Sequence, residues 1–559
     1  MTKEPRIVVI GLDGGTFDVL LPLMKVGHLP NLAGLMERGS WGRLNSTIPP
    51  FTGAAWSTFA TGQNPGQHGI ISFLERDQYN YATKGTGFVD SRRLGHTLWE
   101  IAGEHEKRVA VINVPLTYPP RAINGYMVTG MLTPRGARDY TYPPSFLDAL
   151  GDDYTVDLDF LRKDDRFRSN GFPSKSEILS RIRKMTKARG RLCLKLIGEE
   201  HWDFFMVVFT GTDRLAHFLW DELEPILKND GKPEGRIQSD IVQYLNELDE
   251  IVSQIIVSFG EQSVSFVLSD HGFGPSPTKR VYLNIWLEKL GLLHRRGRDN
   301  LLDLEYWRVR IGRNDTLKGL MRRIIPERTQ SRIRGVAESV SEDIVDWSKT
   351  KAYWVPIYYH VCGIEINLIE SRREGIVSPG EEYERVRDHI ISEAPKIIDP
   401  DSGEPIVEQV FKREELYSGP NVVKFPDIIL ILNPNYITGG SLAGRALAEY
   451  ASPTRPGEHR QDGIFMTSGP SMLSQTDLPD LELVDVPPTI LYAMGLPVPS
   501  YFDGRVLTEL FDPEYLTSFP IVSKEVEESD NVSGTLPQQL SGDEEEQLLE
   551  RLRGMGYID

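Results

Sequence analysis

The chain has 559 residues, of which 40% are hydrophobic, and a formal net charge of −18 at pH 7. This length allows a large hydrophobic core with one or two inserted subdomains. The acidic balance and the lack of a long basic run argue against binding of a nucleic acid polymer through a basic face. A local phosphate site stays open, because a metal ion or a helix N-terminus can bind an anion in an acidic protein.

The cysteine count and the N-terminal sequence indicate in which cellular compartment to expect the protein. Two cysteines, Cys193 and Cys362, favour neither a disulfide framework nor a thiolate metal site. The first residues, MTKEPRIVVIGLDGG, lack the apolar length of a signal peptide, and no run of 18 apolar residues occurs. We therefore expect a soluble, cytoplasmic protein without a membrane span. The sequence carries no signal for the oligomeric state.

Short apolar runs alternate with helical patterns along the chain. The pattern predicts a helix over 237–258, where apolar residues recur at helical spacing. The runs predicted to be buried parallel strands are 6–13, 108–114, 203–210, 264–272 and 427–432. This alternation predicts an α/β fold with a mostly parallel sheet, in which chemistry gathers at the carboxyl ends of the strands.

Two regions interrupt this rhythm and are interpreted as insertions. One spans about 130–200; the other, 290–415, includes a basic helical stretch at 317–334. Both insertions are compatible with a cap over a site and with peripheral packing. The α/β core is then formed by 1–289 and 416–520. The tail, 521–559, is predicted to be an acidic linker followed by a short amphipathic helix.

A single hydroxyl group lies where an extended segment gives way to a predicted helix. The segment reads IPPFTGAAW, and Pro49 and Pro50 oppose helix before Phe51. Thr52 is thus predicted to be the N-cap of the following helix. A capping threonine has a purely structural role in most proteins, so the other polar residues must decide whether Thr52 is functional.

Acids and histidines follow several of the predicted strands. Asp13 ends the first strand, and Asp270-His271 ends a later one. Asp213 and His217 are four residues apart in TGTDRLAH, hence on one face of a helix. His459 lies in a loop, RPGEHRQDG. Carboxylate oxygens and neutral imidazole nitrogens suit zinc and also manganese. Each element alone has a structural explanation, as a turn, a cap or a surface pair, but their co-occurrence favours a metal site.

These residues lie in motifs that resemble the alkaline phosphatase superfamily and, within it, the type I phosphodiesterase/nucleotide pyrophosphatase family. The motifs are VIGLDGGTFD, LPNLAGLMERGSWGRLNSTIPPFTGAAWSTFATGQNPGQHGI, GTDRLAH, LSDHGFGP, GEHRQDGIFMTSGP and DVPPTILYAMGLPVPSYFDGRVL. The resemblance implies an alkaline-phosphatase-like three-layer α/β/α sandwich with a mostly parallel central sheet and inserted cap regions. The insertions and the tail lie outside these motifs.

The resemblance also implies a site with two divalent metal ions, zinc being the implied metal and manganese an alternative. It assigns one ion to Asp13, Thr52, Asp270 and His271, and the other to Asp213, His217 and His459. Thr52 is implied as the nucleophile, so the expected reaction is hydrolysis of a small-molecule phosphoester through a phospho-threonine intermediate. A metal bound to the hydroxyl stabilises its ionised form, and a second metal stabilises the leaving oxygen.

One departure from the family leaves other activities open. Nucleotide pyrophosphatases often carry a phosphate-binding asparagine after the H-G-I block, whereas HGIISFLERD has Phe73 near that position. A phosphomonoesterase and a phosphonate hydrolase are therefore alternatives. A phosphoglycerate-mutase-like phosphoryl transferase is a separate alternative, although a threonine nucleophile favours a hydrolase. A catalytically silent protein that binds an anion or a partner is the alternative outside enzymes. The aromatic run 353–363 is predicted to be a buried strand, although Tyr358, Tyr359 and His360 could also face the site.

Overall fold

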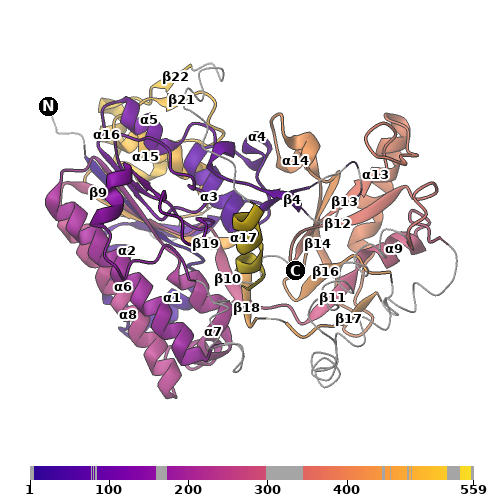
Figure 1. Ribbon diagram of the computed structural model, residues 1–559, viewed down its shortest axis with the longest axis horizontal. Helices are drawn as coiled ribbons and strands as arrows, with labels where there is room; N and C mark the ends of the chain where they lie inside the picture. The colour runs from indigo at the N-terminus through magenta and orange to yellow at the C-terminus, as the bar shows by residue number, and fades with distance from the viewer. Residues whose placement is uncertain are drawn as a thin grey trace.

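The computed structural model places most of the chain in two parts (Figure 1). The described residues are 5–76, 79, 81, 85–158, 173–296, 344–442, 447–453, 455–474, 478–479, 481–525 and 542–554. The predicted basic stretch 317–334 lies outside the described residues, as do 159–172 of the first predicted insertion and 526–541 of the predicted linker.

The larger part is built on a nine-stranded sheet with the order β20-β2-β19-β9-β1-β8-β5-β6-β7. The strands, in that order, are Leu481–Glu482, Ser40–Asn45, Asp462–Ser468, Ser263–Leu268, Arg6–Leu12, Phe204–Phe209, Val109–Ile112, Gly125–Val128 and Thr141–Tyr142. Neighbouring strands from β9 to β6 run parallel, whereas β19 and β7 pair antiparallel with their neighbours. The predicted mostly parallel sheet is confirmed.

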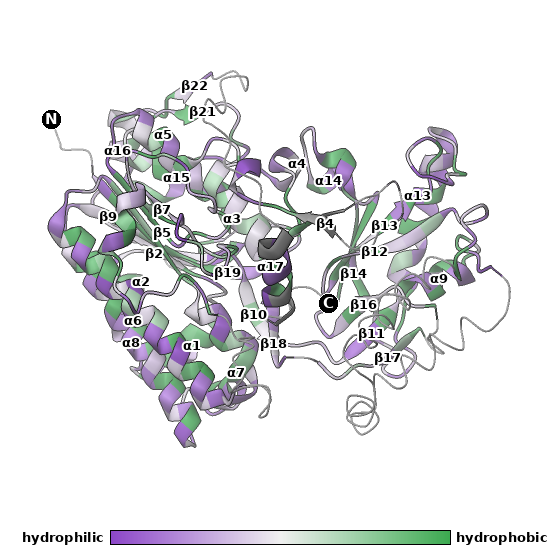
Figure 2. Cartoon of the chain, viewed as in Figure 1, coloured by the Kyte–Doolittle hydropathy of each residue, from purple (hydrophilic) through white to green (hydrophobic). Residues whose placement is uncertain are grey.

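Helices cover both faces of this sheet. One face carries α1 (Phe17–Lys25), α2 (Pro30–Arg38), α6 (Lys175–Glu199), α7 (Gly211–Lys228) and α8 (Arg236–Phe259), and the other carries α3 (Thr52–Thr61), α5 (Leu98–Glu104) and α15 (Val486–Ala493). Val8 and Ile10 of β1 pack toward the first helical layer, and Ile7 and Val9 toward the second, as the two-residue period of a strand requires. This burial on both sides explains the continuous apolar runs, and the apolar centre of the sheet is visible in Figure 2.

Among the described residues no single helix is long and apolar enough to cross a bilayer. Helices α1 and α2 are long and apolar enough only when taken together, and the chain bends by 100° between them. Both contribute buried residues to the hydrophobic cluster on one face of the large sheet.

The smaller part has its own sheets and its own hydrophobic cluster. A four-stranded antiparallel sheet has the order β12-β13-β15-β14, with strands Ala352–Tyr358, Val361–Ile366, Ile428–Leu432 and Val407–Lys412. A three-stranded sheet has the order β16-β11-β17, with strands Tyr436–Gly439, Lys279–Tyr282 and Ala448–Tyr450. Helices α9 (Leu283–Lys289) and α13 (Glu381–Glu393) belong to the same part.

One predicted strand belongs to a different sheet from the one expected. Of the predicted strand 427–432, residues 428–432 form β15, but this strand pairs antiparallel in the smaller part instead of joining the parallel sheet. A short apolar run looks the same in either setting, because both sheets bury both faces of the strand.

A pair of strands and one helix lie where the two parts meet. Strands β10 (Gly272–Pro275) and β18 (Gly457–Arg460) form an antiparallel pair at the end of the large sheet. The C-terminal helix α17 (Gly542–Gly554) lies between the two parts (Figure 1). Among the described residues, the remaining short α-helices and strands are α4 (Pro65–His68), β3 (Leu74–Arg76), β4 (Gly85–Phe88), α14 (Arg413–Leu416), β21 (Val498–Pro499), α16 (Pro513–Ser518) and β22 (Ser523–Lys524).

Candidate metal centre and nucleophile

Three adjacent strand ends supply the acidic side chains of the site. Strands β9, β1 and β8 are neighbours in the sheet and run parallel, so their carboxyl ends lie side by side. Asp13 directly follows β1, and Asp213 lies in the first turn of α7, just after β8. Asp270 and His271 follow β9 after one residue. The order of strands thus brings together residues far apart in the sequence.

The two remaining histidines come from α7 and from the β10–β18 pair. The prediction that His459 lies in a loop is wrong, because residues around it form strand β18, which pairs with β10. His459 lies opposite Phe273 of β10, beside His271. The two imidazole rings stack with centroids 3.5 Å apart. His217 lies one helical turn after Asp213 on α7, and its Nδ1 donates to the carbonyl of Gly457 at 3.1 Å. This bond ties α7 to β18.

Thr52 faces the same cluster from the start of α3. Its Oγ1 lies 3.1 Å from Nε2 of His271, and the residue is fully buried. The prediction that Thr52 is the N-cap is wrong, because Phe51 occupies that position and Thr52 is the first helical residue. The extended Ile48–Phe51 segment therefore ends one residue earlier than expected, and the threonine hydroxyl is directed to the histidine instead of to a helix amide.

One set of ligand atoms gathers around His271. Its Nε2 lies 3.2 Å from Oδ2 of Asp270 and 3.9 Å from Oδ1 of Asp13. Asp13, Asp270 and His271 each offer one ligand atom, and these atoms lie within 4.8 Å of one another. The backbone supports this set, because the N–H of Gly14 donates to Oδ1 of Asp270 at 3.1 Å. Gly14 adopts a positive φ of 66°, which glycine tolerates without strain.

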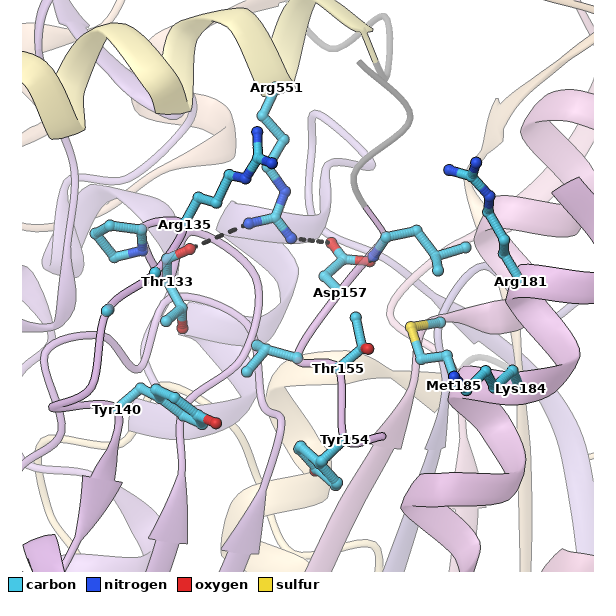
Figure 3. A pocket seen from close by; sticks show the side chains of 15 residues that line it. Thr133, Arg135, Tyr140, Tyr154, Thr155, Asp157, Arg181, Lys184, Met185 and Arg551 are labelled. Atoms are coloured by element: carbon cyan, nitrogen blue, oxygen red, sulfur yellow. Dashed lines mark hydrogen bonds and ion pairs between the residues drawn. The ribbon is translucent and has the colours of Figure 1, made fainter. Parts of the chain in front are cut away.

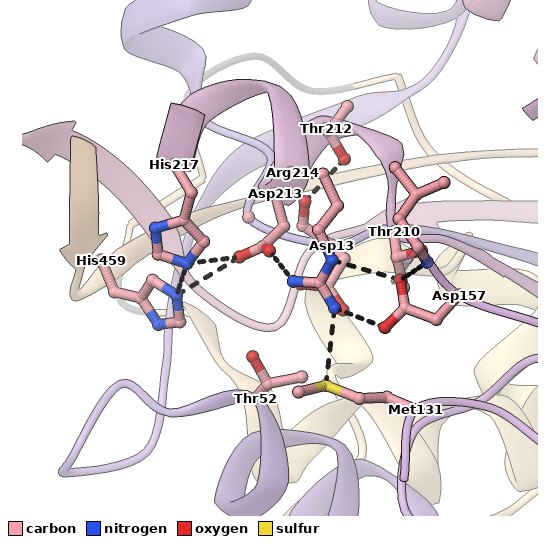
Figure 4. Close-up of polar contacts among 12 residues, drawn as sticks. Asp13, Thr52, Met131, Asp157, Thr210, Thr212, Asp213, Arg214, His217 and His459 are labelled. Atoms are coloured by element: carbon pink, nitrogen blue, oxygen red, sulfur yellow. Dashed lines mark hydrogen bonds and ion pairs between the residues drawn. The ribbon is translucent and has the colours of Figure 1, made fainter. Parts of the chain in front are cut away.

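A second set of ligand atoms gathers around Asp213 (Figure 4). Its Oδ1 lies 3.3 Å from Nε2 of His217 and 3.3 Å from Nε2 of His459, and these two nitrogens are 3.0 Å apart. Asp213, His271 and His459 also form a compact group, with their ligand atoms within 4.8 Å of one another. The two sets are therefore adjacent and meet at His271 and His459.

All three histidines present the same ring nitrogen to the centre. Nδ1 of His217, His271 and His459 lies 3.0–3.1 Å from the backbone carbonyls of Gly457, Gly272 and Pro50, respectively. A carbonyl only accepts, so each Nδ1 carries the proton and donates it. Each Nε2 then directs a lone pair inward, which is the tautomer that a metal ligand requires. Burial lowers the pKa of His217 and of His459, which favours the neutral, ligating form.

The electrostatics of the cluster fit a bound divalent cation. Burial raises the pKa of Asp13 well above its ordinary value, and the nearby Asp270 and Asp213 raise it further. Burial also raises the pKa of Asp270 to about 6. Oδ1 of Asp13 and Oδ2 of Asp270 are buried without a hydrogen-bond partner among the described residues. Without a cation these crowded, buried carboxyl groups tend to take up protons, whereas a divalent ion would favour their ionised, metal-binding form.

The seven predicted site residues therefore lie together in the structure. Each is at most 1% exposed. They are Asp13, Thr52, Asp213, His217, Asp270, His271 and His459. Their individual roles as ligands or nucleophile stay predictions, which the geometry makes specific.

Two residues that hydrogen-bond to the clustered carboxylates are not predicted by the sequence. The indole Nε1 of Trp56 donates to Oδ2 of Asp13 at 3.2 Å. Arg214 is 1% exposed and donates to Oδ2 of Asp213 through Nη1, and to Oδ2 of Asp157 through Nη2 at 2.6 Å. Both residues lie in motifs that contain predicted site residues: Trp56 follows Thr52 by one helical turn, and Arg214 directly follows Asp213. Only the fold shows which way they point.

The smaller part also reaches the site. The hydroxyl of Tyr358 donates to Oε1 of Glu458 at 2.7 Å, and its ring lies 5.0 Å from the ring of His459. Arg455 donates to both carboxylate oxygens of Glu458 and, despite the opposing effect of burial, helps hold its pKa at about 2. The predicted strand over 353–363 proves to be the hairpin β12–β13, and Tyr358 at its turn is the residue that faces the histidines.

Comparisons with known proteins place these observations in a family. The model of the type I phosphodiesterase/nucleotide pyrophosphatase family matches residues 7–451. No curated protein matches the chain in a sequence comparison.

Among solved structures, the chain is similar to phosphonoacetate hydrolase from Sinorhizobium meliloti 1021 in complex with phosphonoacetate, with 16% identity, a TM-score of 0.47, and coverage of 88% of this chain and 96% of the hydrolase. It is also similar to human ectonucleotide pyrophosphatase/phosphodiesterase 5, with 11% identity, a TM-score of 0.47, and coverage of 92% and 99% of the two chains. At these scores the likenesses bear on neither substrate nor mechanism. The family match, which includes six of the seven clustered residues, shows that the chain belongs to the type I phosphodiesterase/nucleotide pyrophosphatase family of the alkaline phosphatase superfamily.

Proposed function

We propose that this protein hydrolyses phosphate diesters or closely related phosphoesters, with Thr52 as the nucleophile and two divalent metal ions at the clustered side chains. The observation that carries the proposal is the convergence of three inward-facing Nε2 atoms and three buried carboxylates next to the hydroxyl of Thr52. One ion would be held by Asp13, Asp270, His271 and Thr52. The other would be held by Asp213, His217 and His459.

The ligand types support zinc, with manganese as the alternative. When bound, the two ions would supply the positive charge that stabilises an ionised threonine hydroxyl and a departing oxygen. The hydroxyl oxygen of Thr52 would attack phosphorus and release the alcohol, leaving a phosphate ester on Thr52. Water would then cleave that ester, release the phosphate product and regenerate the hydroxyl.

The start of α3 supports phosphate binding beside Thr52. The N–H groups of the first turn, including those of Gly53 and Ala54, have no intrahelical acceptor, and the helix dipole favours an anion there. A Cβ at Gly53 would lie 2.7 Å from Cε1 of Phe51 and 3.1 Å from Cε1 of Phe73. Only glycine fits this position without a shift, so the close packing of the phosphate-binding turn depends on it.

The apolar surroundings of this turn favour a diester over a monoester. Phe73, which lies near the position of the family's phosphate-binding asparagine, packs edge-on against Phe51 with ring centroids 4.3 Å apart. Leu116 and Met131 belong to the same hydrophobic cluster. Burying a doubly charged phosphate beside such a wall costs more than burying a singly charged diester. This argument adds to the family match, and it leaves phosphonate and monoester hydrolysis as the activities to compare.

The test is an assay of bis-p-nitrophenyl phosphate, p-nitrophenyl phosphate and phosphonoacetate with zinc, with manganese and with EDTA. We expect the diester to be the best substrate, with turnover lost in EDTA. Thr52→Ala should bind metal as the unaltered protein does and lose turnover, because it lacks the attacking oxygen. Full turnover of this variant would contradict the nucleophile assignment. No turnover of any substrate with metal bound would instead favour a silent binding protein.

A further inference from the structure

The C-terminal helix reaches the metal centre through a line of alternating charges. Arg551 of α17 lies 3.3 Å, Nη2 to Oδ2, from Asp157, whose two oxygens also accept from Nε and Nη2 of Arg214 at 3.2 and 2.6 Å. Arg214 in turn donates to the carboxylate of Asp213. The side chains of Asp213, Arg214 and Asp157 are at most 1% exposed, and that of Arg551 is 11% exposed. The inner part of this line is visible in Figure 4.

The helix is held in place by more than this ion pair. Nη1 of Arg551 donates to the carbonyl of Thr133 at 3.1 Å, so its guanidinium bridges two partners (Figure 3). The next residue, Leu552, is fully buried in the hydrophobic cluster that contains Phe51 and Ala54, the residues on either side of Thr52 and Gly53. The position of α17 is therefore built from one polar and one apolar anchor next to the site.

We propose that Arg551 is a positioning residue of the metal centre: by holding Asp157 it fixes Arg214, and through Arg214 it fixes the carboxylate of Asp213. This inference rests on the proposed two-metal site. Within the described residues, Arg214 and Arg551 are the ion-pair partners of Asp157. Both guanidinium groups, against the effect of burial, help keep the pKa of Asp157 below its ordinary value, so the line carries its full alternating charge at neutral pH.

Two effects of removing Arg551 on metal binding have opposite signs. Loss of a positive charge near a cation site raises the affinity for a metal ion by simple Coulomb attraction. Loss of the contact with Asp157 lowers the metal affinity, because Asp157 and Arg214 are then free to move and no longer hold the carboxylate of Asp213 in place. Outer contacts that orient a metal ligand typically account for about 10- to 100-fold in metal affinity. We therefore expect the positioning effect to dominate.

The cavity beside Arg551 offers a control for the Coulomb effect. Arg551, Asp157 and Lys184 all line one cavity of about 690 Å³ (Figure 3). Lys184 is exposed and makes no ion pair with Asp157. Lys184→Gln therefore removes one positive charge from the same cavity without removing a partner of Asp157.

The experiment measures the zinc affinity of the full-length protein by competition with a chromogenic chelator, and the melting temperature in parallel. The variants are Arg551→Gln, Arg551→Lys, Asp157→Asn, the double variant of Arg551→Gln with Asp157→Asn, and the control Lys184→Gln. We expect Arg551→Gln to weaken the binding of the zinc ion that Asp213 would hold about tenfold. This value is at the low end of the range for contacts outside the ligand set. Arg551→Lys should lose less, because an ammonium can keep one of the two partners. The control should bind zinc as well as, or slightly better than, the unaltered protein.

The double variant tests the route of the effect. If Arg551 acts through Asp157, its replacement changes zinc affinity by less than twofold once Asp157 is already asparagine, because interacting residues are non-additive. If Arg551→Gln lowers the zinc affinity of the Asp157→Asn protein as much as that of the unaltered protein, the proposal is overturned. It is also overturned if the unaltered protein binds two zinc ions and Arg551→Gln binds them with the same affinity. A purely structural role would lower the melting temperature and leave the affinity of the folded protein unchanged, which also overturns it. Absence of zinc binding by the unaltered protein would overturn the two-metal site itself, and this inference with it.

Discussion

Replacement of Trp56 tests how the protein orients the first metal-ligand set. Trp56 is fully buried on α3, and its Nε1 donates to Oδ2 of Asp13 at 3.2 Å. Phenylalanine keeps an aromatic ring at this position but has no donor. Asp13 then loses the contact that holds one of its oxygens while the other faces His271.

The magnitude follows from the charge of the acceptor. A hydrogen bond to a charged group contributes about 1.5–3 kcal/mol, which corresponds to roughly 10- to 150-fold in an equilibrium constant. Loss of the bond also leaves a carboxylate oxygen without this donor and makes it a slightly better cation ligand, but loss of orientation outweighs this gain at metal sites. We expect Trp56→Phe to weaken zinc binding about tenfold or more, and to lower kcat in proportion at limiting zinc.

A neighbouring aromatic residue separates this effect from packing. The Phe59 ring lies 5.6 Å from the Trp56 ring, and Phe59 is equally buried, but its side chain has no hydrogen-bond donor to offer Asp13. Phe59→Leu should lower the free energy of unfolding by about 1–3 kcal/mol, because the smaller side chain leaves a cavity in the core, and should leave the zinc affinity unchanged. Chelator competition and thermal unfolding give both quantities. Equal zinc affinity for Trp56→Phe and the unaltered protein would refute the reasoning.

Three further predictions concern the nucleophile, pH and metal removal. Thr52→Ser keeps the hydroxyl and should retain measurable diester hydrolysis where Thr52→Ala has none; equal inactivity of both in the nitrophenyl assay would contradict the assignment. Burial lowers the pKa of His68 to about 3 from 6.5, with Nδ1 accepting from Ile70 and Nε2 donating to Thr58. Because only the unfolded chain then binds the proton below pH 6.5, the unaltered protein should lose about 1.5 kcal/mol more stability than His68→Gln between pH 6.5 and about 5. Parallel pH dependences in denaturant titrations would exclude this. Removal of metal by EDTA should lower the melting temperature, and zinc at 100 times its Kd should restore about 2.7 kcal/mol; a melting temperature unaffected by zinc would contradict a metal site in the folded state.

The sequence predicts the site better than its surroundings because the ligand residues follow strands. Asp13, Asp213 and Asp270 come at the ends of apolar runs, and parallel order then brings them to one edge of the sheet. His459 is different, because its place depends on the antiparallel pairing of β10 with β18, which no local pattern encodes. The sequence alone marks His459 only as a histidine in a Gly/Pro-rich segment, and the family resemblance assigns it to the second metal ion.

The supporting contacts could not be predicted for a related reason. Arg551 and Asp157 are 394 positions apart in the chain, and their pairing depends on how the C-terminal helix packs against the large part. The misplaced N-cap at Thr52 and the misassigned strand β15 show the same limit at shorter range. Capping preferences and apolar runs describe local choices, whereas contacts across the fold decide between them.

The most direct test of the two-metal account is anomalous scattering from a crystal of the zinc-loaded protein. We predict two peaks, one between Asp13, Asp270, His271 and the hydroxyl oxygen of Thr52, and one between Asp213, His217 and His459. A single peak, no peak, or a Thr52 oxygen remote from both peaks would contradict the account.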